Sequence, residues 1–286
     1  MKIIDGKELS AKIRQTIKQE VQEIKEHGNR SPLLSVILVG DNPASQSYVR
    51  GKENACLSVG MENRTIRLDA NISQAELIQV VRQQNEDPDV DGILVQLPLP
   101  DHFETNPVLD QISPDKDVDG LHPVNAGLLL AGRDGLLPCT PNGVMEMLKS
   151  IGLEDLSGLN AVVVGRSNLV GKPLSLLLQQ KNATVTMAHS RTKDLAQICS
   201  KADILIAAVG RPKMITSEYV KAGAVVIDVG INRMENGKLC GDVDFEDVKD
   251  KASAITPVPG GVGPMTVCML LMNTLKAYKE HESYGR

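Results

Sequence analysis

The chain has 286 residues, enough for two domains that each bury a hydrophobic core. Hydrophobic residues make up 42% and charged residues 23%, as in globular proteins, but aromatic residues only 2%, so the core must be mainly aliphatic. The formal net charge is −5 and the two signs are interspersed. A basic stripe that would bind nucleic acid is therefore not expected.

No apolar run reaches the roughly 18–20 residues of a membrane helix, and the start MKIIDGKELS lacks the apolar segment of a signal peptide. The five cysteines are scattered and never spaced as C-x-x-C, which argues against a disulfide framework or a zinc site. The five histidines show no paired ligand spacing either. We expect a cytoplasmic protein with buried thiols, no metal site and no membrane or nucleic-acid partner.

The first part of the chain alternates helical and strand patterns. Residues 7–27 carry apolar side chains at helical spacing and end at Gly28, which predicts an amphipathic helix. The apolar run LLSVILVG (33–40) is typical of a strand buried on both faces. The alternation continues with helices at 43–59 and 74–85 and strands at 64–68 and 92–97. This order predicts βαβ units with a parallel sheet.

The segment from Pro98 to Pro141 is rich in proline and aspartate, with short helices expected near 104–111 and 124–131. A helix at 142–151 then leads into a second series of buried-strand runs separated by helical patterns. Those runs are 161–165, 184–189, 204–210 and 224–230. A long apolar helix at 264–280 closes a two-domain α/β chain.

The stretch VVVGRSNLVGKP (162–173) is typical of a strand, a glycine turn and a helix start, an arrangement that presents backbone N–H groups to a diphosphate. The dinucleotide fingerprint is incomplete, because Ser167 stands at its second glycine. The P-loop pattern fits less well, since five residues separate Gly165 from Gly171 and Pro173 replaces its Ser/Thr. The turn is therefore either a dinucleotide loop or a turn with ordinary solvated charges.

The end of the next strand distinguishes NAD from NADP. An NAD enzyme carries a carboxylate there, hydrogen-bonded to the adenosine ribose. This chain has HSRTKD instead, beginning at His189, with Ser190, Arg191 and Thr192 where the acid would stand. Hydroxyl and guanidinium groups suit a 2′-phosphate, and Arg166 adds a second cation, so the pattern favours NADP.

Two polar groups adjoin the first series of strands. Tyr48 and Lys52 lie one helical turn apart in SYVRGKENA, and a lysine whose pKa is lowered by burial can transfer protons. The alternative is an ordinary surface contact. Gln96 in VQLPLP stands at the carboxyl end of a buried strand, where open sheets bind ligands.

Two further motifs have structural alternatives. PDKDVDG (114–120) begins like a calcium loop, but Ala126 stands where that loop requires a bidentate Glu. It is either an Asp-Gly turn or a carboxylate offered to a planar ligand edge. TPVPGGVGPMT (256–266) alternates rigid Pro with Gly, which suits close approach to a ligand or a helix entry.

Together these motifs, with PCTPNG and ATVTMAHSRT, make the chain resemble the bifunctional methylenetetrahydrofolate dehydrogenase/cyclohydrolase family over its whole length. The resemblance implies a folate-binding αβα domain at 1–140 and 267–286, and a Rossmann-type NADP-binding domain with a parallel sheet at 141–266. It also implies substrate between the domains, a last helix packed on the first, and a homodimer.

The implied activity is NADP-dependent oxidation of 5,10-methylenetetrahydrofolate to the methenyl cation and hydrolysis of that cation to 10-formyltetrahydrofolate, a part of one-carbon metabolism. Lys52 is the implied group for hydrolysis, with Tyr48 and Gln96 positioning it, and Asp119 grips the pterin. Further implied folate contacts are Leu97, Pro98, Gly260, Gly261 and Pro264. The implied cofactor contacts are Thr140, Gly165, Arg166, Ser167, Val170, Gly171, His189, Ser190, Arg191, Thr192, Ala208, Gly210, Asp228, Gly230 and Ile231.

Two other functions remain open from the residues alone. A two-domain dehydrogenase of a small hydroxy acid would need a carboxylate-binding arginine and an acid/base near the nicotinamide. A regulatory nucleotide-binding module without catalysis would tolerate changes on the Lys52 face. Folate-dependent reduction of NADP⁺ distinguishes the implied enzyme from both.

Overall fold

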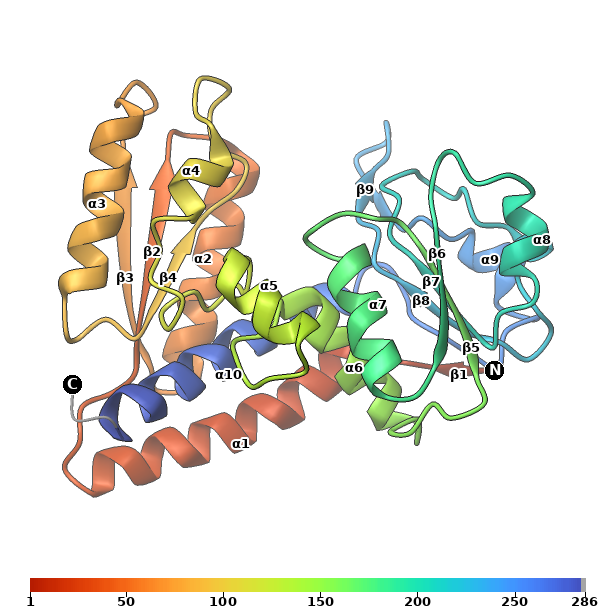
Figure 1. Ribbon diagram of the computed structural model, residues 1–286, viewed down its shortest axis with the longest axis horizontal. Helices are drawn as coiled ribbons and strands as arrows, with labels where there is room; N and C mark the ends of the chain where they lie inside the picture. Colours follow the sequence, from red (N-terminus) through yellow and green to blue (C-terminus); the bar gives the residue numbers. More distant parts are fainter. Residues whose placement is uncertain (284–286) are drawn as a thin grey trace. The chain divides into compact units, whose positions relative to one another are not determined.

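The computed structural model describes residues 1–283, which form two compact α/β units (Figure 1). The three-stranded unit comprises Lys12–Cys139 and the chain from Val267 on, and the six-stranded unit comprises Met1–Ala11 and Thr140–Thr266. Residues 284–286 of the expected folate segment lie outside the described residues. Each unit has a parallel sheet, so the expected fold class is confirmed.

The sheet of the three-stranded unit has the order β3-β2-β4, formed by β2 (Leu33–Val39), β3 (Glu62–Leu68) and β4 (Gly92–Val95). The chain runs from β2 to β3 through α2 (Pro43–Ser58) and back across β2 to β4 through α3 (Gln74–Glu86). Right-handed crossovers in opposite directions place these two helices on opposite faces of the sheet. All seven residues of β2 are buried, as its continuous apolar run predicts.

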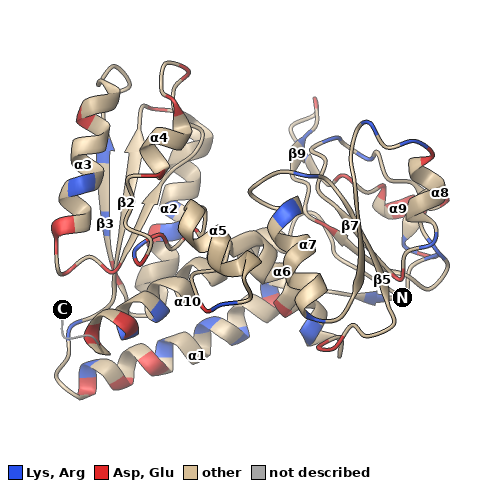
Figure 2. Ribbon diagram, in the orientation of Figure 1, with Lys and Arg blue, Asp and Glu red and all other residues tan. Residues whose placement is uncertain are grey.

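Two long helices, α1 (Gly6–Glu26) and α10 (Val262–Ser283), belong to this unit over most of their length, from Lys12 and from Val267 on, and lie side by side (Figure 1). Lys279 of α10 pairs with Glu20 of α1, so the last helix packs on the first, as the resemblance implies. The α1 face with Ile17 and Val21 is buried, and positive and negative residues are interspersed along the helix (Figure 2). The shorter helices are α4 (Thr105–Leu109) and α5 (Pro123–Leu130).

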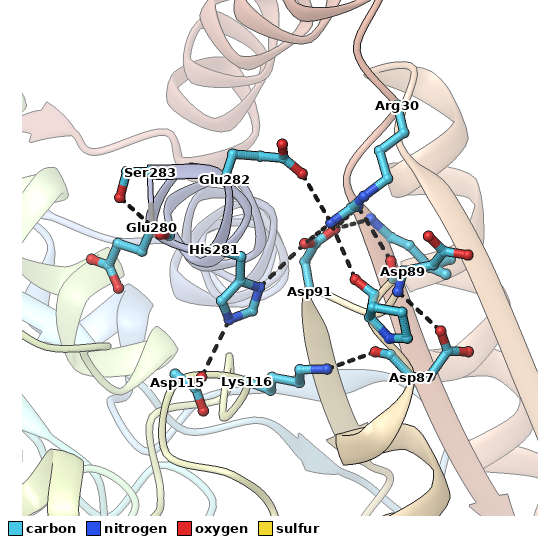
Figure 3. A network of polar contacts seen from close by, with 12 residues as sticks. Arg30, Asp87, Asp89, Asp91, Asp115, Lys116, Glu280, His281, Glu282 and Ser283 are labelled. Carbon is cyan, nitrogen blue, oxygen red and sulfur yellow. Dashed lines mark hydrogen bonds and ion pairs between the residues drawn. The ribbon is translucent and has the colours of Figure 1, made fainter. Parts of the chain in front are cut away.

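A polar network joins segments of the three-stranded unit that are far apart in the sequence (Figure 3). The buried His281 of α10 has Nδ1 3.3 Å from Asp91 Oδ1 and Nε2 3.5 Å from Asp115 Oδ2. Arg30 donates to both Asp91 oxygens, at 2.7 and 2.8 Å. Lys116 donates to main-chain carbonyls at the end of α3. The network therefore ties the loop of Asp115 and Lys116 to α10 and to the start of β4.

The sheet of the six-stranded unit has the order β1-β11-β8-β7-β5-β6, and every neighbouring pair is parallel. Its strands are β1 (Lys2–Ile3), β5 (Asn160–Val164), β6 (Thr184–Ala188), β7 (Ile204–Ala207), β8 (Val225–Asp228) and β11 (Ala254–Ile255). Its helices are α6 (Cys139–Ser150), α7 (Gly171–Gln180), α8 (Leu195–Cys199), α9 (Phe245–Val248) and the single turn η1 (Ser217–Tyr219). A separate two-stranded sheet pairs β9 (Asn232–Arg233) antiparallel with β10 (Leu239–Cys240).

The strand order reverses between β5 and β7, because the chain goes from β5 outward to β6 and then returns to β7. Such a switch point leaves a crevice at the carboxyl ends of the strands, where doubly wound folds bind dinucleotides. One face of this sheet packs against α8 and α9 through an aliphatic core that includes Leu205 and Val226. This core matches the low aromatic content of the sequence.

The N-terminal residues differ from the expected domain boundary. The sequence places all of 1–140 in the folate domain, whereas Met1–Ala11 and Thr140 cluster with the six-stranded unit. The reason is β1, where the N–H of Lys2 donates to the Ser253 carbonyl at 2.7 Å and the N–H of Ile4 to the Ile255 carbonyl at 2.9 Å. An edge strand of two residues, paired with β11 about 250 residues later, is too short to show a periodic pattern in the sequence.

Candidate functional site

The glycine turn after β5 lies at the switch point, and two of its residues can only be glycine. Gly165 has a φ of +139°, and a Cβ there would lie 2.3 Å from the carbonyl oxygen of Ala208. A Cβ on Gly171, the first residue of α7, would lie 2.2 Å from the carbonyl oxygen of Gly165. The turn therefore brings the N-terminus of α7 close to the ends of β5 and β7, as a phosphate-binding loop requires.

Ser167 stands at the second glycine of the dinucleotide fingerprint, and its hydrogen bonds stabilise the turn. Its hydroxyl accepts a hydrogen bond from the N–H of Val170 at 3.1 Å, and its carbonyl accepts one from the N–H of Lys172 at 3.1 Å. Arg166 is exposed on the same turn. The loop thus offers an anionic ligand the Arg166 cation and the positive end of the α7 dipole, while Ser167 accepts hydrogen bonds from the first N–H groups of the helix.

The turn after β6, at 189–192, was expected to bind the adenosine ribose, and it lies next to the glycine turn because β5 and β6 pair in parallel with Val164 opposite Ala188. The turn is closed locally, since the Thr192 hydroxyl accepts from the N–H of His189 at 2.9 Å and His189 Nδ1 accepts from the N–H of Arg191 at 3.2 Å. Ser190 and Arg191 are exposed. A hydroxyl and a guanidinium are therefore available where an NAD enzyme has a carboxylate.

The remaining expected cofactor contacts belong to the six-stranded unit, and most follow strand ends. Ala208 and Gly210 follow β7, Gly230 and Ile231 follow β8, and Ile231 is 50% exposed. The Thr140 hydroxyl lies 2.9 Å from that of Thr266. Asp228 differs from the others, because its carboxylate is buried and accepts hydrogen bonds from backbone N–H groups.

Lys52 and Gln96 meet in the three-stranded unit, 44 residues apart in the chain. Lys52 Nζ donates to Gln96 Oε1 at 2.9 Å, and Gln96 Nε2 donates to the Leu97 carbonyl at 2.6 Å. Helix α2 presents Lys52, and its N-terminus is capped by the Asn42 side chain. Burial lowers the pKa of Lys52, while the negative charge of Asp119 opposes that shift. The lysine is thus poised to exchange a proton.

Tyr48 lies one turn before Lys52 on α2 and is 56% exposed. The expected pair therefore shares one helix face, with the phenol toward solvent. Leu97 is half-buried and Pro98 is exposed, and the peptide bond between them is cis. These residues follow β4 directly, so the residues expected to bind folate, Lys52, Gln96, Leu97 and Pro98, gather at the carboxyl end of this sheet.

Asp119 lies beside this group. Burial raises the pKa of Asp119, while the charge of Lys52 and a hydrogen bond with the Cys139 thiol act in the opposite direction. Gly120 follows with a φ of +73°, and a Cβ on it would lie 2.4 Å from the carbonyl carbon of Leu137. The segment is therefore an Asp-Gly turn that also presents a carboxylate near the lysine.

The neighbouring aspartates of PDKDVDG have structural partners instead. Asp117 is buried and accepts from the His122 N–H at 2.8 Å and from Asn125 Nδ2 at 2.9 Å. Asp115 belongs to the His281 network. Among the described residues, no group of three or more His, Cys, Asp and Glu side chains is placed to hold a metal ion.

Two residues near Asp119 were not proposed from the sequence. The Cys139 thiol donates to the Val118 carbonyl at 3.2 Å. The motif PCTPNG, which contains Cys139, is the only local pattern that could have pointed to this residue. Asn273 Nδ2 donates to the carbonyls of Val118 and Leu137, both at 2.8 Å. No local pattern could reveal Asn273, which is 155 residues from Val118.

The glycine-rich turn before α10 belongs to the six-stranded unit, unlike the other expected folate contacts. Gly260 has a φ of +106°, and its carbonyl accepts a hydrogen bond from the N–H of Lys7 at 3.1 Å. A Cβ on Gly6 would lie 1.8 Å from the Gly261 carbonyl oxygen. The glycines thus permit close packing on the start of α1, and Pro264 lies in the first turn of α10.

Comparison with known proteins identifies both parts of the chain. Residues 4–119 match the family description "Tetrahydrofolate dehydrogenase/cyclohydrolase, catalytic domain", and residues 138–282 match its "NAD(P)-binding domain". The chain belongs to the tetrahydrofolate dehydrogenase/cyclohydrolase family. It is therefore a dehydrogenase and cyclohydrolase, as the sequence motifs imply, and the two alternative functions are set aside.

Individual members of the family are similar over nearly the full length. "Bifunctional protein FolD" of Bacillus subtilis is 56% identical over 277 residues, which is 97% of each chain. The crystal structure of the Campylobacter jejuni FolD enzyme superposes with a TM-score of 0.96 at 50% identity, covering 98% of this chain and 99% of that one. The Trypanosoma brucei enzyme, complexed with NADP cofactor and an inhibitor, has a TM-score of 0.92 at 41% identity, with 97% of each chain covered.

Proposed function

We propose that the protein oxidises 5,10-methylenetetrahydrofolate with NADP⁺ and hydrolyses the resulting 5,10-methenyltetrahydrofolate to 10-formyltetrahydrofolate. The names of its relatives support this assignment, since FolD enzymes are described as methylenetetrahydrofolate dehydrogenase/cyclohydrolases. We assign the folate chemistry to the three-stranded unit, with Lys52, Gln96 and Asp119, and the dinucleotide to the six-stranded unit.

The residues around the switch point fit the dinucleotide. Gly165 and Gly171 let the backbone turn tightly enough to bring the N-terminus of α7 to the strand ends, where a diphosphate would bind, and Arg166 supplies a positive charge. The exposed Ser190 and Arg191 would hold the 2′-phosphate, which favours NADP over NAD. When bound, the nicotinamide ring accepts the hydride.

Oxidation needs little acid–base catalysis from the protein. The methylene carbon stands between two nitrogens, whose lone pairs stabilise the cation left after hydride loss. The main task is therefore to orient the folate. We assign the pterin anchor to Asp119, because a carboxylate can accept two parallel N–H bonds from the aminopyrimidinone edge.

Hydrolysis does need proton transfer, because water adds to the cationic carbon, the bond from that carbon to N5 breaks, and one water proton moves to N5 while the other is released. The observation that carries our assignment is the Lys52 Nζ to Gln96 Oε1 hydrogen bond of 2.9 Å on a lysine whose pKa burial lowers. Burial favours the neutral form of the Lys52 amine, to which we assign acceptance of a proton from the attacking water. Gln96 orients that amine, and Tyr48 on the same helix face contacts the substrate.

An absorbance assay tests the function. The purified protein is given methylenetetrahydrofolate with NADP⁺, then with NAD⁺ in a matched reaction, and the methenyl and formyl products are followed separately. We expect faster reduction of NADP⁺ and disappearance of the methenyl absorbance. Faster reduction of NAD⁺ would contradict the cofactor assignment, and absence of folate-dependent reduction would contradict the enzyme assignment.

We also propose, from the family resemblance, that the protein acts as a homodimer in the cytoplasm. Analytical ultracentrifugation tests the first point, and a single species with the mass of one chain would contradict it. Cell fractionation tests the second. Within the described residues, no helix combines the length and apolar character needed to cross a bilayer.

A further inference from the structure

Asp242 is a fully buried carboxylate that lies outside the residues assigned to the reaction. Its Oδ2 accepts hydrogen bonds from the N–H groups of Val209 at 2.7 Å and Gly210 at 3.0 Å. Its Oδ1 accepts from the N–H of Arg211 at 2.9 Å and from Asn232 Nδ2 at 2.9 Å. Four donors therefore converge on one carboxylate, and three of them are consecutive backbone groups of the loop after β7.

Three consecutive N–H groups aimed at one point form a nest, which in other proteins binds phosphate or another anion. Here an internal carboxylate fills the nest and holds the loop in one conformation. The fit is close, because a Cβ on Gly230 would lie 2.3 Å from Asp242 Cγ. The loop after β7 and the residues after β8 are thus both packed on Asp242.

Asp228 at the end of β8 holds Asp242 in place. Its carboxylate accepts hydrogen bonds from the N–H of Asp242 at 2.9 Å, of Val243 at 2.9 Å and of Gly230 at 3.0 Å. A Cβ on Gly241 would lie 1.8 Å from Asp228 Oδ2. Two buried carboxylates in series therefore connect β8 to the loop after β7.

The position of this pair in the sheet points to the nicotinamide half of the cofactor. In a doubly wound fold the diphosphate lies over the first glycine turn, here at Gly165, and the adenosine ribose lies at the end of the next strand, β6. The other half of the dinucleotide then extends across the switch point, over the ends of β7 and β8. Those are the two segments that Asp242 holds.

We propose that Asp242 is a positioning residue for hydride transfer: it fixes the loops after β7 and β8, and through them the orientation of the nicotinamide. This inference rests on the proposed function. It assigns Asp242 to the dehydrogenase reaction alone, because the group proposed for hydrolysis belongs to the three-stranded unit. The two activities of one protein therefore provide an internal control.

The test is Asp242→Asn, which keeps the size of the side chain but replaces one acceptor oxygen by an NH₂ group. That group faces N–H donors, so the loop must move. We expect dehydrogenase kcat to fall by about tenfold or more, with cyclohydrolase activity within about twofold of the wild type. We also expect a larger primary isotope effect with substrate deuterated at the methylene carbon, because hydride transfer would limit the rate more strongly.

The matched control is Asp244→Asn, the same substitution two residues later. Asp244 pairs with Lys213 at 3.3 Å with both side chains partly exposed, so both activities should be unchanged. If Asp242→Asn does not fold, Asn232→Ala replaces it, because this variant removes a single donor to the carboxylate. It should lower dehydrogenase kcat in the same selective way, to a smaller extent.

Three results would overturn the proposal. They are equal losses of both activities in either variant, unchanged dehydrogenase kcat, and a selective loss without any increase of the isotope effect. These results differ from failure of the proposed function itself. In that case the wild-type protein would show no folate-dependent reduction of NADP⁺ before any variant is compared.

Discussion

His281 is expected to make the stability of the protein depend on pH in the alkaline range. The adjacent carboxylates of Asp115 and Asp91 raise the pKa of His281 from 6.5 to about 9. Because the folded state binds the proton more tightly, the stabilisation is fully present below pH 6.5 and is lost as pH rises through about 9. A shift from 6.5 to about 9 corresponds to about 3 kcal/mol. The side chain is only 7% exposed, so solvent screens this interaction little.

The perturbation is His281→Gln, which removes the titrating group and keeps a polar side chain. We expect the free energy of unfolding at about pH 6 to fall by about 3 kcal/mol relative to the wild type, and the difference to shrink strongly at about pH 10. Urea unfolding followed by circular dichroism at both pH values measures this. Because the chain has two units, the transition that responds must be fitted separately.

The control for this experiment is His102→Gln, which changes an exposed histidine of the same unit. Its effect on the free energy of unfolding should be small, because the side chain is exposed. The reasoning would be refuted if the His281→Gln variant differed from the wild type equally at about pH 6 and about pH 10. That result would mean that the folded state does not bind the His281 proton more tightly than the unfolded chain.

Three other variants test the site. Lys52→Met should lower cyclohydrolase activity by about a hundredfold or more while folate binding changes much less, because the proton acceptor is lost; unchanged methenyl hydrolysis would remove Lys52 from the mechanism. Arg191→Ala should raise the Michaelis constant for NADP⁺ by roughly tenfold, because a charge-assisted bond to the 2′-phosphate is lost. The constant for NAD⁺ should not change, and equal effects would argue against this contact. Asp119→Asn should weaken folate binding by about tenfold, measured by calorimetry, and an unaltered dissociation constant would reject the anchor role.

Local patterns were sufficient for most of the main elements. The run at 33–40 predicted a strand covered on both faces, and β2 is fully buried. The expected helix at 43–59 corresponds to α2 (Pro43–Ser58), and that at 74–85 to α3 (Gln74–Glu86). Such elements are readable because burial on one or both faces imposes a period on neighbouring residues.

Very short strands could not be predicted from the sequence. The strands β1, β9, β10 and β11 have two residues each, so their positions come from pairing partners and not from a repeated pattern. The pairing of β1 with β11 moved Met1–Ala11 into the six-stranded unit, against the expected boundary. Hydrogen bonds between distant segments decided that assignment.

By itself, the sequence determined which residue types stand at which turns. Gly165 and Gly171 indicated a backbone that approaches a ligand, HSRT indicated a 2′-phosphate partner, and the order of the motifs indicated the family. These are local properties, because backbone conformation and side-chain chemistry act over a few residues.

Only the tertiary structure decided which distant groups share an environment. It brought Lys52 to Gln96, separated the Asp119 carboxylate from the structural Asp117, and placed Asp242 against the loop after β7. The pKa of Lys52 is lowered because folding removes water from around it, and no spacing in the chain encodes that burial. Desolvation and long-range hydrogen bonds exist only once the chain is packed, so the reactivity of the site is a property of the fold.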